Sequence, residues 1–103
     1  MAEHDILLRA IRKYGERSQQ DKFIEEASEL IKAILKLRYC NKDYEKQIVQ
    51  DAVDEEMADV QIMMEQLTMI YDNAERVELQ KKKKIERLER RMNAEVSDII
   101  PRE

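Results

Sequence analysis

The sequence has few of the residues that interrupt helices. Among its 103 residues there are one glycine, one proline and no tryptophan, and aromatic residues make up 5%. Glycine and proline are the least favourable residues in helix interiors, whereas Leu, Met, Glu, Lys and Arg are well tolerated there. The hydrophobic content of 43% is too high for a disordered chain. The composition therefore predicts an all-α protein, with residues 1–103 forming one small domain.

Cysteine and histidine are also scarce. A single cysteine, Cys40, excludes an internal disulfide bond, which favours a cytoplasmic protein. The one histidine, His4, lies near the N-terminus. A ferritin-like di-iron site is excluded because that fold needs Glu-x-x-His on two helices. A cysteine nucleophile paired with histidine is also not expected, and we interpret both residues as structurally incidental.

Long apolar runs and an excess of basic charge are missing as well. No apolar stretch approaches the length that spans a membrane, and the N-terminus lacks a signal-peptide pattern, so we expect no membrane association. The formal net charge of -4 argues against general nucleic-acid binding.

Apolar spacing and breaks predict four helices. The first covers about residues 3–14 and stops at Gly15, and Ser18 then caps a second helix that reaches about residue 39. Residues 41–43 are a polar break, followed by a short separate helix or a kink before about residue 52. The main third helix continues to residue 71, and a fourth covers about residues 74–92. The short break at 72–73 predicts that the third and fourth helices pack antiparallel in a four-helix bundle.

A tail from residue 94 follows the fourth helix. It loses the helical pattern, and Pro101 prevents a continuation. We expect its apolar residues Val96, Ile99 and Ile100 to pack on the bundle or on a neighbouring subunit.

Two acidic motifs dominate the pattern. One is Glu25-Glu26-x-x-Glu29 and the other is Glu55-Glu56-x-x-Asp59. Residues three apart lie about 60° apart on a helix, so each motif can present two carboxylates to one point. In a chain that is 41% charged, such pairs also arise by chance on solvated helix faces.

The phase of the motifs argues against a solvated face. On helical wheels, Glu26 and Glu56 project into the apolar stripe of their own helix, and Glu29 and Asp59 flank it. The stripe of the second helix comprises Phe23, Ala27, Leu30, Ile31, Ile34 and Leu37, and that of the third comprises Val53, Met57, Val60, Met64, Leu67 and Tyr71. An ionised carboxylate that faces a core costs several kcal/mol unless a positive charge lies against it. Four converging carboxylates therefore predict a cation, and oxygen ligands favour Mg²⁺ or Mn²⁺.

A basic run lies in the fourth helix. Residues 81–84 are all lysine, and Arg87, Arg90 and Arg91 follow. Such runs are usually solvated, but Lys84, Arg87 and Arg91 lie on or beside the flank of the apolar stripe formed by Val77, Ile85, Leu88 and Met92. We expect these three side chains to face the acids across the bundle.

With these motifs the chain resembles the MazG-like all-α nucleoside triphosphate pyrophosphohydrolases. Glu25-Glu26-Ala27-Ser28-Glu29 and Glu56-Met57-Ala58-Asp59 match the family's E-E-x-x-E and E-x-x-D motifs. KYGERSQQDKFIEEASELIKAI, ADVQIMMEQL and KIERLERR look like the short phage and prophage members. The resemblance covers about residues 6–91, and the insertion 42–54 is longer than in the family.

The resemblance implies Mg²⁺-dependent hydrolysis of a nucleoside triphosphate to its monophosphate and pyrophosphate. Such hydrolysis would remove unwanted nucleotides from the nucleotide pool. The resemblance also implies that Glu26, Glu29, Glu56 and Asp59 are metal ligands. Glu25, Glu26 and Glu56 are the catalytic candidates, and Glu25 and Glu55 would at most support the metal ligands from outside. Lys84, Arg87 and Arg91 would bind phosphates, and Gln19 would approach the base.

Two further expectations concern assembly. The apolar arc of the second helix is wider than a single seam, and the third helix is apolar on two faces, so a homo-oligomer is expected, a tetramer more than a dimer. The alternative function is a non-catalytic helical interaction module in which the acids are only solvated charge.

Overall fold

The computed structural model describes residues 2–98, with side chains described for residues 2–95, and within this range the chain is all-helical and has no strand. The helices are α1 (Glu3–Tyr14), α2 (Glu16–Arg38), α3 (Lys46–Tyr71) and α4 (Ala74–Asp98), with a short 3-10 turn η1 (Asp43–Glu45) before α3. The prediction of an all-α chain with four helices is thus confirmed. No helix in this part of the chain is long and apolar enough to cross a membrane.

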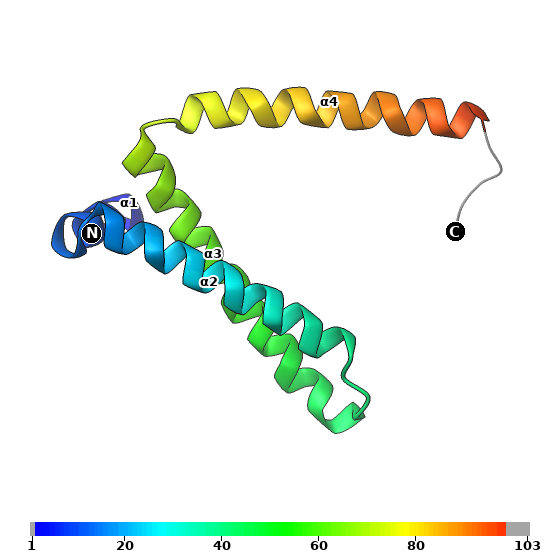
Figure 1. The fold of residues 1–103 in the computed structure, drawn as a ribbon, viewed down its shortest axis with the longest axis horizontal. Coiled ribbons are helices and arrows are strands. Elements are labelled where there is room, and N and C mark those ends of the chain that lie inside the picture. Colours follow the sequence, from blue (N-terminus) through cyan, green and yellow to red (C-terminus); the bar gives the residue numbers. More distant parts are fainter. Residues whose placement is uncertain (1, 99–103) are drawn as a thin grey trace. The chain divides into compact units, whose positions relative to one another are not determined.

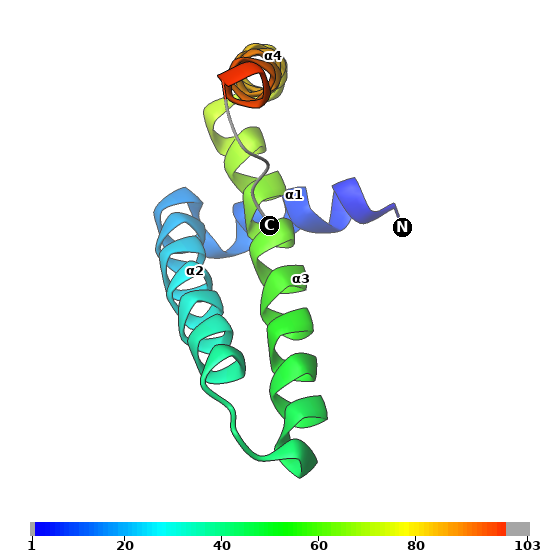
Figure 2. The ribbon, with the colours of Figure 1, turned by 90° about the vertical axis from the view of Figure 1, so that its right-hand side faces the viewer.

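The chain divides into two units, Met1–Asp72 and Asn73–Glu103, and each is described by itself. The packing of all four helices into one bundle therefore stays a prediction. In the first unit, α2 and α3 run antiparallel side by side, and α1 lies across the end where α2 begins and α3 ends (Figures 1 and 2). The second unit consists of α4 in its described part.

Gly15 joins α1 to α2 without a loop. Its φ of 94° lies in the left-handed region, which glycine adopts at little cost. Its N–H donates to the carbonyl of Ile11 at 2.8 Å, and its own carbonyl accepts from the N–H of Gln19 at 3.1 Å, so one residue closes one helix and opens the next. The predicted cap at Ser18 was therefore wrong, because α2 has already begun at Glu16.

The helix boundaries differ from the prediction at two further places. The polar break ends in η1, which is the short separate element expected before residue 52, but it ends at Glu45 and α3 is already continuous from Lys46. The fourth helix continues to Asp98, because residues 93–98 contain no glycine or proline and a loss of apolar spacing alone does not stop a helix. Ile99 and Ile100 and the side chain of Val96 lie outside the described residues.

The core of the first unit is a narrow seam between α2 and α3. The buried residues of α2 are Gln19, Glu26 and Ala33, which follow one another at intervals of seven. Those of α3 are Val53, Met63 and Gln66, and α1 adds Ile11. A spacing of seven is the repeat of two helices that pack along a single line. Three of these seven buried side chains are polar or charged, so the seam is built around polar groups as much as apolar ones.

This narrow seam leaves much of the predicted apolar stripes uncovered. Met57, Met64 and Tyr71 were expected to face inward but are 47%, 42% and 52% exposed, whereas Met63 is buried. Ile31 and Ile34 of α2 are exposed as well. One neighbouring helix covers only a narrow strip of the surface of another, so a wide apolar arc needs more partners than α1, α2 and α3 supply to one another.

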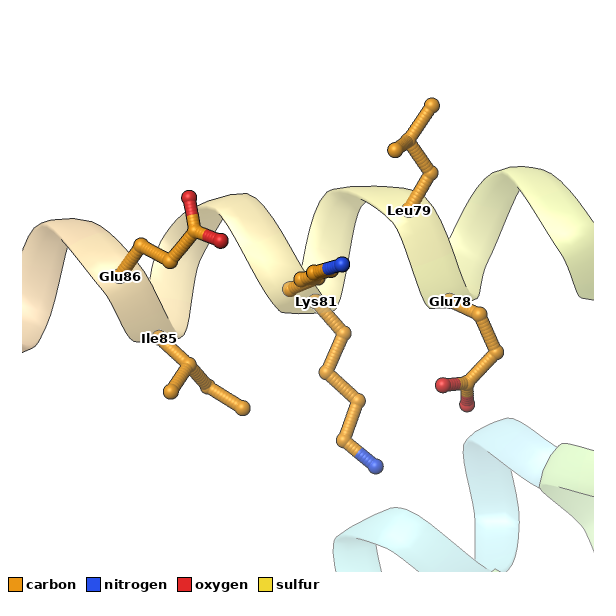
Figure 3. A pocket seen from close by; sticks show the side chains of 6 residues that line it. Glu78, Leu79, Lys81, Ile85 and Glu86 are labelled. Carbon is orange, nitrogen blue, oxygen red and sulfur yellow. The ribbon is translucent and has the colours of Figure 1, made fainter.

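In the second unit, the apolar stripe of α4 is exposed along its length. Its members are Val77, Ile85, Leu88 and Met92. A shallow depression on the same helix is lined by Leu79 and Ile85 together with charged side chains (Figure 3). These charged side chains are Glu78, Lys81, Lys82 and Glu86. Since α4 alone supplies every one of these residues, the depression is an open surface of one helix and does not form an enclosed site.

Candidate metal centre

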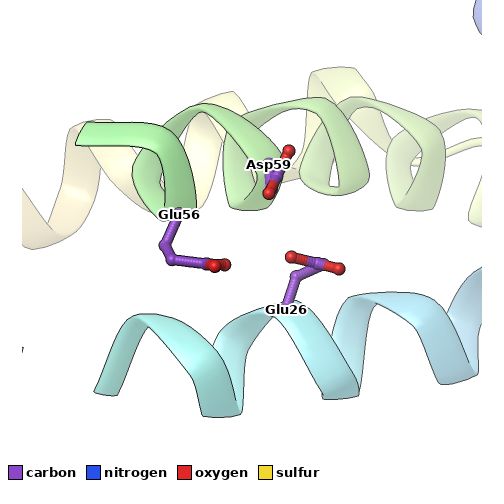
Figure 4. Close-up of side chains that lie close together, drawn as sticks. All are labelled: Glu26, Glu56 and Asp59. Atoms are coloured by element: carbon purple, nitrogen blue, oxygen red, sulfur yellow. The ribbon is translucent and has the colours of Figure 1, made fainter. Parts of the chain in front are cut away.

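Three carboxylates from the two motifs meet between α2 and α3. Glu26 points from α2 toward α3, Glu56 points back toward α2, and Asp59 lies beside them (Figure 4). One oxygen of each lies within 4.8 Å of the others, which is close enough for a single cation to contact all three. Glu26 is buried, as its place in the apolar stripe predicts, and Glu56 is half-buried.

The charges of the cluster are only partly balanced by a lysine. Lys22 Nζ lies 3.1 Å from Glu26 Oε1 and 3.9 Å from Glu25 Oε2. The hydrogen bond from Lys22 lowers the pKa of Glu26, against the opposing effect of burial. In turn, the hydrogen bond to Glu26 and the charge of Glu25 raise the pKa of Lys22, and Asp59 adds a smaller contribution.

The two acids that α3 contributes to the cluster, Glu56 and Asp59, are not neutralised by a lysine in this way, and the pKa of each is raised. Burial raises the pKa of Glu56, and hydrogen bonding to Glu26 and the charge of Glu26 add to this effect. Burial likewise raises the pKa of Asp59, followed by the charge of Glu26. Asp59 is exposed overall, so the charge of Glu26 is the firmer of the two causes for that residue. Carboxylates that lie side by side favour protonation unless a cation joins them. Without a metal, Glu56 and Asp59 thus hold protons more readily than ordinary acids.

The donor set fits a hard divalent cation. All three side chains offer oxygen, which is the ligand atom that Mg²⁺ and Mn²⁺ prefer. Oε2 of Glu56 is buried and has no hydrogen-bond partner, which leaves a lone carboxylate oxygen without a positive or donating group. Beside Glu56, a depression of about 100 Å³ also contacts Glu29.

The outer acids of the first motif lie apart from the three converging oxygens. Glu29 is 48% exposed at its side chain and pairs with Lys32 at 3.6 Å, although it lines the depression beside Glu56. Glu25 is 63% exposed and contacts Lys22. The structure therefore brings together three of the four predicted ligands, and Glu29 is their neighbour.

The predicted substrate-binding residues are found in different settings. Gln19 is buried, and its Nε2 donates to Oε1 of Gln66 at 2.8 Å, so the carboxamide already has a partner within the seam. Lys84, Arg87 and Arg91 are exposed on α4 in the second unit. A contact between these cations and the acids stays a prediction.

Two residues of the site were missed from the sequence, and both carried a signal. Gln66 follows Asp59 by seven residues, just as Gln19 precedes Glu26 by seven, so the two glutamines and the two acids face one another across antiparallel helices. Lys22 precedes Glu26 by four residues, which places it one helical turn away.

Comparison with protein-family models, curated proteins and solved structures finds no match for this chain.

Proposed function

We propose that this chain is a MazG-like, Mg²⁺-dependent nucleoside triphosphate pyrophosphohydrolase of the short phage type, which cleaves the α–β bond to give a nucleoside monophosphate and pyrophosphate. The observation that carries the proposal is the convergence of Glu26, Glu56 and Asp59 from the two motifs within 4.8 Å. A role in clearing unwanted nucleotides from the cytoplasmic pool goes with this activity.

Glu26, Glu56 and Asp59 would hold Mg²⁺, or Mn²⁺ in its place, and Glu29 would reach the same site from the adjoining depression. A bound divalent ion lowers the pKa of water and offsets charge on the phosphates. The residues themselves provide the negative charge that retains the ion, and they surrender the protons that burial favours on Glu56 and Asp59. Glu25 supports Glu26 from outside through their shared contact with Lys22.

The substrate chemistry requires positive charge in addition. A triphosphate carries about four negative charges, which carboxylates can approach only through cations. Lys84, Arg87 and Arg91 are the cations that we propose for the outer phosphates, since ammonium and guanidinium groups bind phosphate oxygens through charge-assisted hydrogen bonds. Gln19 is proposed near the base, and it would use the carboxamide oxygen that its bond to Gln66 leaves free.

The deciding experiment is a product assay. The protein is incubated with Mg²⁺ and a panel of ribo- and deoxyribonucleoside triphosphates, and pyrophosphate is measured separately from orthophosphate. The proposal predicts monophosphate and pyrophosphate in equal amounts, with activity abolished by excess chelator. Release of orthophosphate with a diphosphate, or equal turnover in chelator, contradicts it.

A second candidate is a non-catalytic helical oligomerisation module. The observation that favours it is the exposed apolar surface, which includes Ile24, Ile31 and Leu35 on α2 as well as Met57 and Met64 on α3. Exposed patches of this kind mark subunit contacts. Metal dependence separates the two candidates, because a module of solvated acids should show no thermal shift with Mg²⁺.

The same surface supports assembly of the enzyme. We propose a homo-oligomer, a tetramer rather than a dimer, formed through α3 and part of α2, in which methionines adapt to a symmetric copy. Light scattering coupled to size-exclusion chromatography at micromolar concentration tests this. A monomeric mass in a folded, active sample with Mg²⁺ and nucleotide contradicts it.

A further inference from the structure

Lys22 is placed on the acidic cluster in a way that a surface lysine does not require. Its side chain is 49% exposed, so solvent is available to it, yet its ammonium group lies 3.1 Å from a carboxylate oxygen of Glu26, whose side chain is only 11% exposed. The same ammonium group lies 3.9 Å from Glu25. A half-exposed cation therefore reaches toward the least exposed acid of the cluster.

The helix alone does not account for this contact. A lysine that precedes a glutamate by four residues is the weaker orientation of the pair, and exposed ion pairs contribute little to stability. Glu26 differs from other acids on α2 because Glu56 and Asp59 lie next to it, with oxygens within 4.8 Å of its own. Three carboxylates this close attract whichever cation is available, and Lys22 is the lysine that one helical turn places within reach.

A comparison with the other lysine pair on α2 supports this interpretation. Lys32 lies 3.6 Å from Glu29, but that side chain is 48% exposed and is not one of the three converging acids. Of these two lysines on α2, Lys22 is the one that pairs with a member of the cluster.

We infer that Lys22 is the internal counter-cation of the cluster, which occupies Glu26 when no metal is bound and which a divalent ion must displace. This inference rests on the proposed function, because it concerns the same metal site. Lys22 is a positioning residue, since it acts through Glu26 and is not itself a ligand.

The exchange is physically reasonable for this side chain. The lysine stem is long and flexible and its head is already half in solvent, so the ammonium group can leave Glu26 without a change in the helix. A divalent ion carries twice the charge of the ammonium group and can contact three carboxylates at once, whereas Lys22 contacts one of them closely. The lysine thus weakens the apparent affinity of the site for a divalent ion.

The test is calorimetric titration of Mg²⁺, and of Mn²⁺, into the wild-type protein and into Lys22→Met, which keeps the stem and removes the charge. We expect the variant to bind metal about fivefold more tightly, the effect of losing one partly exposed ion pair. Lys22→Arg should restore the weaker wild-type affinity. Lys46→Met is the matched control, because Lys46 pairs with Asp43 at 3.5 Å outside the cluster, and its loss should leave the affinity unchanged.

Thermal unfolding without metal supplies the second readout. Lys22→Met should unfold at a lower temperature than the wild type, and saturating Mg²⁺ should abolish that difference, because the metal has then already displaced the lysine in the wild type. A merely structural lysine would lower stability under both conditions. Lys22→Gln is the second variant, and helical circular dichroism establishes that each variant is folded.

Each outcome decides the inference. Unchanged or weaker metal binding by Lys22→Met and Lys22→Gln overturns it, and so does equal tightening by Lys46→Met. Failure of the proposed function looks different: metal binds, Lys22→Met tightens it, and no triphosphate yields pyrophosphate. If neither the wild type nor the variants bind metal, the inference and the metal site are both rejected.

Discussion

In α2, the acids of the first motif have lysines beside them: Lys22 contacts Glu25 and Glu26, and Lys32 contacts Glu29. The second motif, in α3, has the same spacing but no such neighbours on its own helix, because residues 47–72 contain no lysine or arginine. The difference appears in the pKa values, which fall for Glu26 and rise for Glu56 and Asp59. Equal spacing therefore does not produce equal chemistry, and α3 is the helix whose acids most need a cation.

The largest effect is expected where the two motifs meet. Glu26→Gln and Glu56→Gln should each lower pyrophosphohydrolase activity about 100-fold or more, because even residues that only support metal ligands contribute about 10- to 100-fold. Each substitution removes a charge at nearly constant volume, so the helices should remain. Steady-state kinetics at saturating Mg²⁺ measures the loss.

The adjacent acids provide the control for this experiment. Glu25→Gln and Glu55→Gln change the same charge one residue away, outside the three converging oxygens, and should lower activity by about tenfold, the lower end of the effect of residues that support metal ligands. Wild-type turnover by Glu26→Gln at saturating Mg²⁺ would remove that residue from the site.

The next largest effect is expected on stability, from the hydrogen-bonded pair of Gln19 and Gln66 in the same seam. Gln66→Ala should lower the free energy of unfolding by about 1–3 kcal/mol, because it leaves the buried amide of Gln19 without its partner. Replacing both residues by leucine should be closer to neutral, since no polar group is then left unpaired. Urea unfolding of the three proteins tests this, and equal stability of Gln66→Ala and the wild type would show that the bond contributes nothing.

A smaller effect is expected from pH in the absence of metal. A carboxyl group whose pKa is raised by folding contributes stability below its unfolded value, and this is lost as pH rises through the folded value. Glu56 and Asp59 therefore lower stability as pH rises above their ordinary values of 4.5 and 3.8. Glu26 has the opposite sign, so its contribution is lost as pH falls below 4.5.

The measurement is the unfolding midpoint against pH in chelator. We expect the midpoint to fall between mildly acidic and neutral pH, and the slope to flatten in Glu56→Gln and in saturating Mg²⁺. A midpoint that rises with pH over this range in the metal-free wild type would mean that Glu26 outweighs the two acids of α3.

The smallest effect is expected at the outer edge of the first motif. Lys32→Met removes the partner of Glu29, and exposed ion pairs of this kind contribute at most about 1 kcal/mol. Because Glu29 lies outside the three converging oxygens, the Mg²⁺ affinity should change by less than about twofold, a fraction of that energy. Tightening as large as that expected for Lys22→Met would instead show that Glu29 contributes to metal binding as much as Glu26 does.

The sequence was sufficient for whatever a single helix determines. Composition predicted the helical class, and the helical wheel placed Glu26 on a buried face, because both depend on local spacing. Prediction from the sequence failed where the packing of a second helix determines which side chains are buried. Met57 and Met63 both lie near the apolar face of α3, and the direction from which α2 approaches determines that Met63 is buried and Met57 exposed.

The roles of Lys22 and Gln66 were missed for the same reason, because each depends on the packing of α2 against α3. A lysine four residues before a glutamate is common on solvated helices, and the pattern alone does not reveal that this glutamate meets two more acids across the seam. The partner of Gln19 depends on how α2 and α3 align, which no property of either helix specifies by itself. The stop of α1 at Gly15 was predicted correctly, but the start of α2 was placed too late, because the single residue Gly15 joins the two helices where a longer connection was expected.

The bond between Gln19 and Gln66 has a consequence for how the two helices slide past one another. The buried positions of α2 recur every seven residues, so a slip of α2 along α3 by one heptad would keep the same face of α2 in the seam. It would also place Gln19 opposite Asp59 or Asn73, and Glu26 opposite Ala52 or Gln66, which disperses the three acids. The pair of Gln19 and Gln66 forms only in the alignment that brings the three acids together, so this hydrogen bond favours the register of the charged site one heptad away.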